Sequence, residues 1–125
     1  MLNVLVVDDS AVTRAMILKT LRVAGIDVGE THEAPDGLAG LEVLTQHWVD
    51  LAFVDINMPV MNGEEMISRI RENPAWSDLP VIVVSTEGSQ TRIERLQGKG
   101  AYFIHKPFSP EAVRDVVQDI LGVHT

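Results

Sequence analysis

The pattern that most constrains the fold of this chain is a set of three short apolar runs rich in β-branched residues. They span residues 4–7 (VLVV), 51–54 (LAFV) and 81–84 (VIVV). Runs that are apolar throughout are typical of strands covered on both faces, as in a parallel sheet. Two weaker strand candidates lie near residues 27–34 and at residues 101–104. We therefore expect an α/β protein with a five-stranded parallel sheet.

Helical patterns separate these runs, so that a strand–helix unit repeats five times. Right-handed crossovers would place helices on both faces of the sheet, a doubly wound arrangement that binds ligands at the carboxyl edge of its strands. The segment 89–97 has only Ile93 and Leu96 as large apolar residues. A helix there would be loosely held and is a candidate for movement or partner contact. Apolar residues recur more clearly at helical spacing near residues 13–24, 38–44, 66–70 and 110–121.

Several residues predict how the helices begin and pack. Ser109 can cap the last helix, and Pro110 suits its first position. Trp48 and Trp76, near helix ends, are expected to anchor packing. The expected buried stripe of the last helix comprises Val113, Val116, Val117, Ile120 and Leu121.

Composition excludes several classes of function. The 125 residues suit one domain with a buried core. Ten basic and eighteen acidic residues give a net charge of −8, which disfavours direct nucleic-acid binding. The absence of cysteine excludes disulfides and thiolate chemistry. No apolar run approaches the roughly 18 residues of a membrane span, and the start lacks the marks of a signal peptide. We therefore expect a cytoplasmic protein without membrane insertion.

Five polar residues come at or just past the ends of the expected strands, namely Asp8, Asp9, Asp55, Ser85 and Lys106. The carboxyl ends of parallel strands open onto one edge of a sheet, so we expect these side chains to gather there. Three carboxylates, a hydroxyl and an ammonium suit a divalent cation and a phosphoryl group. Each residue alone is as readily explained as a helix cap or a solvated turn residue. The combination favours a site.

The oxygen atoms expected at this edge match the preference of Mg²⁺, which takes about six oxygen ligands. One or both acids of the first loop, Asp55 and a backbone carbonyl beyond it would meet that need. Asn57 can supply the carbonyl because the turn 57–59 (NMP) bends the chain back. The metal would neutralise charge on an incoming phosphoryl group.

Four segments of this sequence resemble the receiver domain of bacterial response regulators. They are residues 6–10 (VVDDS), 54–59 (VDINMP) together with 61–63 (MNG), 83–87 (VVSTE) and 106–108 (KPF). Each is weak alone, but together they stand in the right order at matching strand ends. The resemblance covers residues 1–125 and implies a single, stand-alone receiver domain of the CheY-like kind. It also implies a flavodoxin-like fold with strand order 2-1-3-4-5.

The resemblance implies a phosphorylation-dependent switch of a two-component system, as in chemotaxis. Asp55 would be the phosphoacceptor, taking a phosphoryl group from a histidine kinase, a phosphotransfer protein or a small phosphodonor. Mg²⁺ would be held by Asp8, Asp9, Asp55 and the Asn57 carbonyl, while Ser85 and Lys106 would contact the phosphoryl oxygens. Such a protein is not an enzyme acting on other substrates, although it promotes its own phosphorylation and slow self-dephosphorylation.

The resemblance also locates the switch and two departures from the family pattern. Phe103 stands where many members have the tyrosine that changes rotamer, and simple core packing is the alternative explanation for it. Thr86 stands where alanine or glycine is usual and would narrow access to Asp55. The surface around residues 86–106 would change partner binding. With no DNA-binding segment after the last helix, output is expected through another protein.

Other interpretations remain open from the sequence. The chain is alternatively a receiver domain excised from a larger regulator or hybrid kinase. A Mg²⁺-dependent phosphohydrolase with an aspartyl-phosphate intermediate fits less well, because a DxDx[TV] motif is replaced by Asp8-Asp9-Ser10-Ala11. A nucleotide- or flavin-binding module would need a glycine-rich first loop. The spacing of His32, His47, His105 and His124 forms no metal-binding motif, so we expect solvated or packed histidines.

Overall fold

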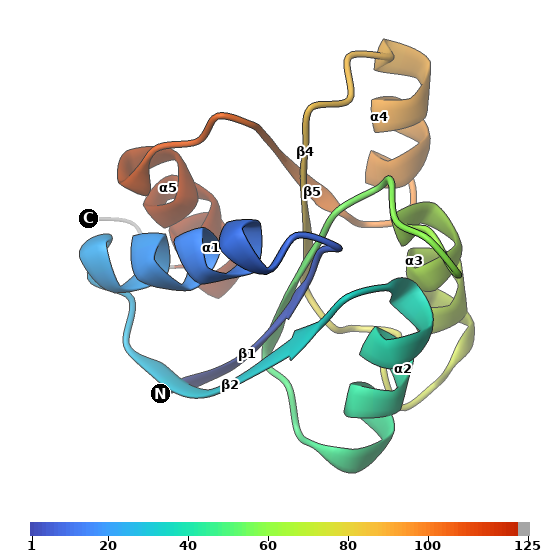
Figure 1. Cartoon of the computed structure of the whole chain (residues 1–125), viewed down its shortest axis with the longest axis horizontal. Coiled ribbons are helices and arrows are strands. Elements are labelled where there is room, and N and C mark those ends of the chain that lie inside the picture. Colours follow the sequence, from blue (N-terminus) through green and yellow to red (C-terminus); the bar gives the residue numbers. More distant parts are fainter. Residues whose placement is uncertain (123–125) are drawn as a thin grey trace.

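The structure is a computed structural model that describes residues 1–122, so that His124 lies outside the described residues. Its five parallel strands follow the order β2-β1-β3-β4-β5 (Figure 1), which confirms the expected flavodoxin-like topology. The elements are β1 (Leu2–Val7), α1 (Ala11–Val23), β2 (Val28–Ala34), α2 (Gly37–Gln46), β3 (Leu51–Val54), α3 (Gly63–Glu72), β4 (Val81–Ser85), α4 (Gln90–Gln97), β5 (Tyr102–His105) and α5 (Pro110–Leu121).

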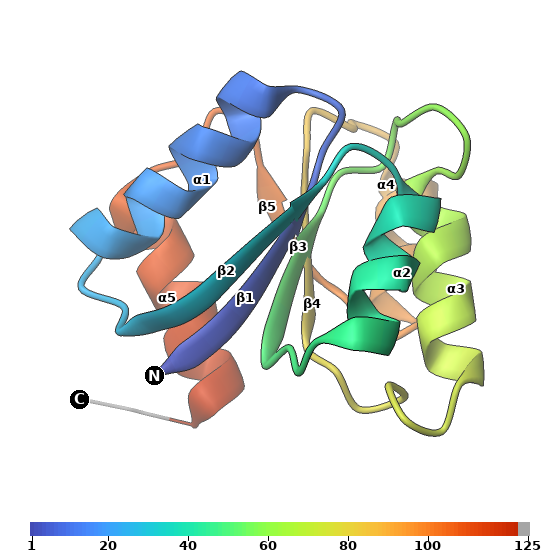
Figure 2. The same ribbon diagram turned by 60° about the horizontal axis from the view of Figure 1, so that its bottom comes forward.

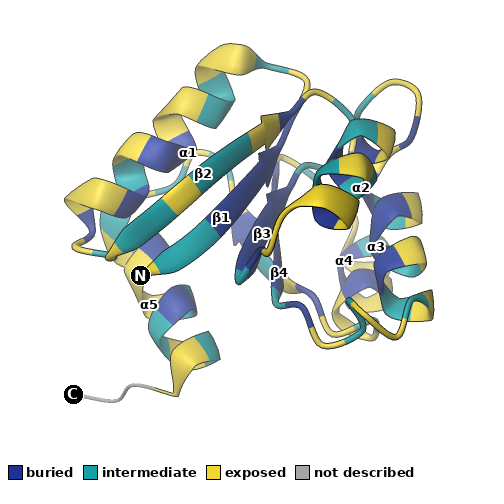
Figure 3. Cartoon of the chain, turned by 90° about the horizontal axis from the view of Figure 1, so that it is seen from below, coloured by how far each residue is buried: buried dark blue, intermediate teal, exposed yellow. Residues whose placement is uncertain are grey.

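Helices cover both faces of the sheet, with α1 and α5 on one side and α2, α3 and α4 on the other (Figure 2). Successive residues of a strand point to opposite faces. In β1, Leu5 and Val7 therefore join the core under α2–α4, while Val4 and Val6 join the core under α1 and α5. The inner strands are buried on both sides (Figure 3), which is the physical reason for their continuous apolar runs.

Helix α5 begins as the sequence predicts, but its C-terminal end is less buried than predicted. The Ser109 side chain accepts a hydrogen bond from the backbone N–H of Ala112, and Pro110 occupies the first turn. Leu121 is 50% exposed, so its assignment to the buried stripe was wrong. It is the last helical residue, directly before Gly122 turns the chain out of the helix at φ +70°. None of the helices in residues 1–122 is long and apolar enough to cross a membrane.

Strand register sets which residues meet at the carboxyl edge. Val7 of β1 lies beside Val54 of β3, so the residues that follow them, Asp8 and Asp55, emerge side by side. Val54 in turn pairs with Val83 of β4. The carboxyl ends of β1, β3 and β4 therefore lie side by side at one edge of the sheet.

Candidate functional site

The three predicted carboxylates meet at the carboxyl edge of the sheet. The backbone N–H of Asp55 donates to the carbonyl of Val7 at 2.9 Å, and that of Asp8 donates to the carbonyl of Ala34 at 3.1 Å. One carboxylate oxygen from each of Asp8, Asp9 and Asp55 lies within 4.8 Å of the others. We call these three residues the carboxylate cluster.

Asp8 is the most deeply placed member of the cluster, with only 1% of its surface exposed. Its Oδ1 accepts a hydrogen bond from the Ser10 backbone at 2.8 Å, and its Oδ2 lies 3.0 Å from Nζ of Lys106. A buried carboxylate must be compensated by hydrogen bonds or an opposite charge, and Asp8 has both. Arg14 fixes the same loop by donating to the carbonyl of Asp8 at 2.6 Å and to Glu33 at 3.0 Å.

Asp55 combines partial burial with a defined orientation. Its side chain is 12% exposed, its Oδ1 accepts from the Ile56 backbone at 2.8 Å, and its Oδ2 lies 3.5 Å from Nζ of Lys106. Burial raises the pKa of Asp55 above its ordinary value, and the charge of Asp8 raises it further against the opposing effect of Lys106. A cation beside the two carboxylates would relieve both costs.

Ser85 is the last residue of β4, Lys106 directly follows β5, and a backbone hydrogen bond joins the two. The backbone N–H of Lys106 donates to the carbonyl of Ser85 at 2.9 Å. The Ser85 hydroxyl oxygen accepts from the backbone of Glu87 at 3.2 Å, an interaction that leaves its proton free to donate. The bond between Lys106 and Pro107 is cis. The ammonium group of Lys106 lies between the carboxylates of Asp8 and Asp55.

The remaining residues of the predicted site lie around this cluster. Asn57 is exposed in the loop after Asp55, and Thr86 is exposed directly after β4. Phe103 is half-buried, packs partly against the core under α2–α4, and meets the ring of His105 edge-on at 4.6 Å. The ring is therefore neither fully locked in the core nor free in solvent.

Two residues that support the site were not assigned a role from the sequence. No role was predicted for Arg14, yet it holds the Asp8 loop. Gly63 ends the MNG segment, one of the parts that resemble receiver domains, and no role of its own was predicted. Its N–H donates to the carbonyl of Ile56 at 2.8 Å, and an added Cβ would collide with the backbone carbonyl of Asp55. The glycine of the MNG segment was the available signal for this close approach.

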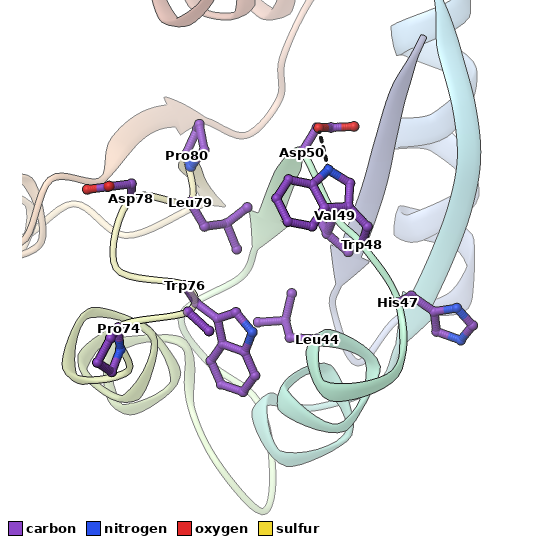
Figure 4. Close-up of a pocket in the computed structure, with 11 residues that line it drawn as sticks. Leu44, His47, Trp48, Val49, Asp50, Pro74, Trp76, Asp78, Leu79 and Pro80 are labelled. Atoms are coloured by element: carbon purple, nitrogen blue, oxygen red, sulfur yellow. Dashed lines mark hydrogen bonds between the residues drawn. The ribbon is translucent and has the colours of Figure 1, made fainter.

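A pocket of about 520 Å³ lies at the opposite edge of the sheet, between the segments that lead into β3 and β4 (Figure 4). Trp76 packs partly against the core there, as predicted for an anchor. Trp48 is 74% exposed, so the same prediction was wrong for it. Its indole is held at the surface by a 2.9 Å hydrogen bond from Nε1 to Asp50. This pocket contains no member of the carboxylate cluster.

This chain is similar to known proteins in both sequence and structure. The family model of the response regulator receiver domain matches residues 4–118. A chemotaxis protein CheY homolog of Campylobacter jejuni is 36% identical over 123 residues, covering 97% of this chain and 93% of that protein. The sensor histidine kinase CheAY of Helicobacter pylori contains a segment 36% identical over 118 residues, which covers 92% of this chain and 14% of that protein.

A solved structure also resembles this chain in its fold. The structure of the chemotaxis response regulator CheY4 of Vibrio cholerae superposes with a TM-score of 0.83 at 33% identity, covering 96% of this chain and 98% of that one. The family match extends through all five strands and contains the whole carboxylate cluster. The chain belongs to the response regulator receiver domain family and is a CheY-like signalling protein.

Proposed function

We propose that this protein is a phosphorylation-dependent switch of a two-component system, with Asp55 as the phosphoacceptor. One observation carries the proposal. The Asp55 carboxylate emerges beside that of Asp8 at the carboxyl edge of the sheet, with the ammonium group of Lys106 within 3.0 Å of Asp8 and 3.5 Å of Asp55. This arrangement offers a nucleophile together with a cation that can meet a phosphoryl oxygen.

The orientation of Asp55 supports its role as nucleophile. Its Oδ1 is occupied by the backbone of Ile56, whereas Oδ2 faces Lys106. We assign Oδ2 as the atom that forms the new bond to phosphorus while the phosphorus bond to the donor breaks. An ionised carboxylate needs no general base, so positioning and charge neutralisation supply most of the acceleration.

The carboxylate cluster fits a resident Mg²⁺. Its members present three acidic oxygens to one region, and burial together with the charge of Asp8 raises the pKa of Asp55, a cost that a cation offsets. Asp8, Asp9, Asp55 and the backbone carbonyl of Asn57 would hold the ion. When bound, Mg²⁺ supplies positive charge to the phosphoryl oxygens. Lys106 and the buried hydroxyl of Ser85 then donate hydrogen bonds to those oxygens.

The switch connects this site to the surface formed by residues 86–106. Movement of Ser85 toward a phosphoryl oxygen would pull the β4–α4 loop at Thr86 and open space for Phe103 to turn inward. The altered surface of α4 and β5 would then change affinity for a partner protein. Slow hydrolysis of the aspartyl phosphate at the same site returns the switch to its resting state.

The partners follow from the family and from the charge of the chain. A sensor histidine kinase of Helicobacter pylori carries a segment similar to this chain, and several relatives are named as chemotaxis proteins. A histidine kinase or phosphotransfer protein is therefore the proposed donor, and the target is another protein. The net charge of −8 argues against direct nucleic-acid output. We assign residues 1–125 as one receiver domain acting in the cytoplasm.

Intact-mass spectrometry tests the assignment of the acceptor. With acetyl phosphate and Mg²⁺, the protein should gain about 80 Da, one phosphoryl unit, and Asp55→Asn should not. Asp27→Asn, which changes an exposed aspartate before β2, is the matched control and should be labelled like the natural protein. Labelling of Asp55→Asn to the same stoichiometry, or labelling of the natural protein that does not depend on Mg²⁺, would refute the proposal.

A further inference from the structure

Two histidines and a glutamate from distant parts of the sequence meet beside the edge strand β2. Glu30 and His32 are alternate residues of β2 and share a face, and His47 follows α2 as its C-cap. The rings of His32 and His47 stack at a centroid distance of 4.1 Å and an angle of 26°. One ligand atom from each of the three residues lies within 4.8 Å of the others. We call these residues the β2–α2 triad.

The triad is separate from the carboxylate cluster. His32 pairs in register with Leu5 of β1, and Asp8 lies three residues further along, about 10 Å away at the rise of a strand. Leu5 packs under α2–α4, so its neighbour His32 faces the same side, toward α2. Figure 4 shows the His47 ring directed away from the pocket that holds Trp76, which frees it to face β2.

One nitrogen of the triad is buried without a hydrogen bond. Nε2 of His32 is inaccessible to solvent and has no partner among residues 1–122. It lies 3.6 Å from Oε2 of Glu30, which is too far for a hydrogen bond. A buried polar atom without a partner costs free energy, so this nitrogen is available to a ligand that lies in the plane of the His32 ring. The exposed His47 ring now stacks over the face of His32 and would turn out of that stack to reach the same ligand.

The end of α2 adds a second attraction for a cation. Helix carbonyls give the C-terminus a partial negative charge, which basic side chains often offset. The last turn of α2 contains no basic residue, and His47 stands directly at its C-cap. A positive ion beside His47 would therefore interact favourably with the helix and with the carboxylate of Glu30.

The ligand chemistry selects the kind of ion. Two imidazoles and one carboxylate suit Zn²⁺ and neighbouring transition metals, whereas Mg²⁺ prefers oxygen ligands alone. Ligand atoms around tetrahedral Zn²⁺ lie about 3.3 Å apart, closer than the 4.8 Å limit that encloses the triad. Glu30 and His47 are both exposed, so their side chains can close this gap by changing rotamer while His32 stays in place.

We propose that Glu30, His32 and His47 form a binding site for a divalent transition-metal ion, represented by Zn²⁺. The bound ion joins the edge strand β2 to the C-terminus of α2 and leaves a coordination position for water. Binding of the ion to the folded state alone would raise the thermal stability of the domain. The site is independent of phosphorylation at Asp55.

Titration calorimetry of the full chain with Zn²⁺ tests the site, with Mg²⁺ present in excess to occupy the carboxylate cluster. We expect one Zn²⁺ per chain, and weakening of about tenfold or more in His32→Gln and in His47→Gln. The midpoint of thermal unfolding should rise with Zn²⁺ in the natural protein and rise less in these variants. Circular dichroism confirms their fold, and the exposed position of His47 makes that variant structurally safe.

Three control variants separate the triad from other candidate ligands. His105→Gln, His124→Gln and Asp9→Asn each remove one such ligand outside the triad and should bind Zn²⁺ as the natural protein does. Unchanged affinity in both His32→Gln and His47→Gln would overturn the proposal. Loss of binding in Asp9→Asn would overturn it as well, because the ion would then belong to the carboxylate cluster.

Discussion

The loop of residues 55–62 follows β3, and helix α4 follows β4, but different forces hold the two segments. The loop is fixed by backbone contacts. The N–H of Gly63 donates to the carbonyl of Ile56 at 2.8 Å, and the N–H of Gly37 donates to that of Met61 at 2.9 Å. Gly63 also lies directly against the carbonyl of Asp55. These contacts permit little movement of Asp55.

Helix α4 is held mainly by ion pairs between side chains near the protein surface. It buries only Ile93 and Leu96. Arg95 pairs with Glu64 of α3, and Arg92 pairs with Glu87 at 3.0 Å. Ion pairs at or near the surface contribute little to stability and are screened by salt. The Asp55 carboxylate is therefore held in place, while helix α4 can shift at small cost in free energy.

The largest expected effect on stability comes from a substitution that disturbs the loop of residues 55–62. Gly63→Ala should lower the free energy of unfolding by about 3 kcal/mol, because its Cβ must displace the backbone of Asp55. Chemical denaturation measures the change. Gly88→Ala is the control, since an added Cβ there meets nothing within 4 Å. Equal losses in the two variants would show that the loop is not tightly packed against Asp55.

The second prediction compares two arginines around α4. Arg71 of α3 donates to the carbonyls of Lys99 and Leu79, both at 2.7 Å, and so ties the turn after α4 to the lead into β4. Arg71→Met should cost about 2 kcal/mol, because charged hydrogen bonds to partly buried carbonyls are lost. Arg95→Met should change thermal stability far less, since that side chain pairs at the surface. A larger loss in Arg95→Met would reverse the comparison.

The third prediction concerns strain within the fixed loop. Val60 has φ of +66°, a left-handed conformation that β-branched residues rarely adopt, and its side chain is exposed. Val60→Asn should stabilise the protein by about 1 kcal/mol, because asparagine tolerates this conformation. Val60→Ala, which keeps a Cβ without the branch, should gain less. Thermal unfolding distinguishes these outcomes, and destabilisation by Val60→Asn would contradict them.

The smallest effect on stability is expected at the ion pairs of α4. Hydrogen bonding from Arg95 lowers the pKa of Glu64, so its stabilising contribution is present above the ordinary glutamate pKa of 4.5 and is lost as pH falls through the lowered value. Glu64→Gln should cost less than about 1 kcal/mol at neutral pH. It should nevertheless speed hydrogen exchange in α4.

Glu65 provides the matched control for that experiment, because its ion pair within residues 1–122 is with Arg69 of the same helix, at 3.2 Å. Glu65→Gln should leave exchange in α4 unchanged. If high salt accelerates α4 exchange in the natural protein but not in Glu64→Gln, the ion pairs are the restraint. If neither variant nor salt alters exchange, burial of Ile93 and Leu96 alone holds the helix.

The sequence predicted those features that depend on local pattern. Continuous apolar runs located the inner strands because both of their faces are buried, and strand ends then located Asp8, Asp9 and Asp55. The cap at Ser109 was predictable because it needs only neighbouring residues. The roles assigned to Ser85, Lys106 and the other site residues stay predictions until phosphorylation is measured.

Features that depend on distant packing were not predictable in this way. His32 and His47 meet only because the length of α2 returns the chain to β2, and no sequence motif records that geometry. The conformation of Val60 is imposed by the loop on either side, against the preference of valine. The exposure of Trp48 follows from its bond to Asp50, which apolar patterns do not reveal.

The placement of the two tryptophans also decides what the intrinsic fluorescence of this protein reports. Trp48 and Trp76 both lie at the edge of the sheet opposite Asp55 (Figure 4). Their emission is therefore a poor reporter of phosphorylation, for which mass is the better readout. Trp48 directly follows His47, so its emission is well placed to be quenched by Cu²⁺ or Ni²⁺ bound to the β2–α2 triad. The intrinsic fluorescence of this protein therefore reports on the edge of the sheet opposite its proposed phosphorylation site.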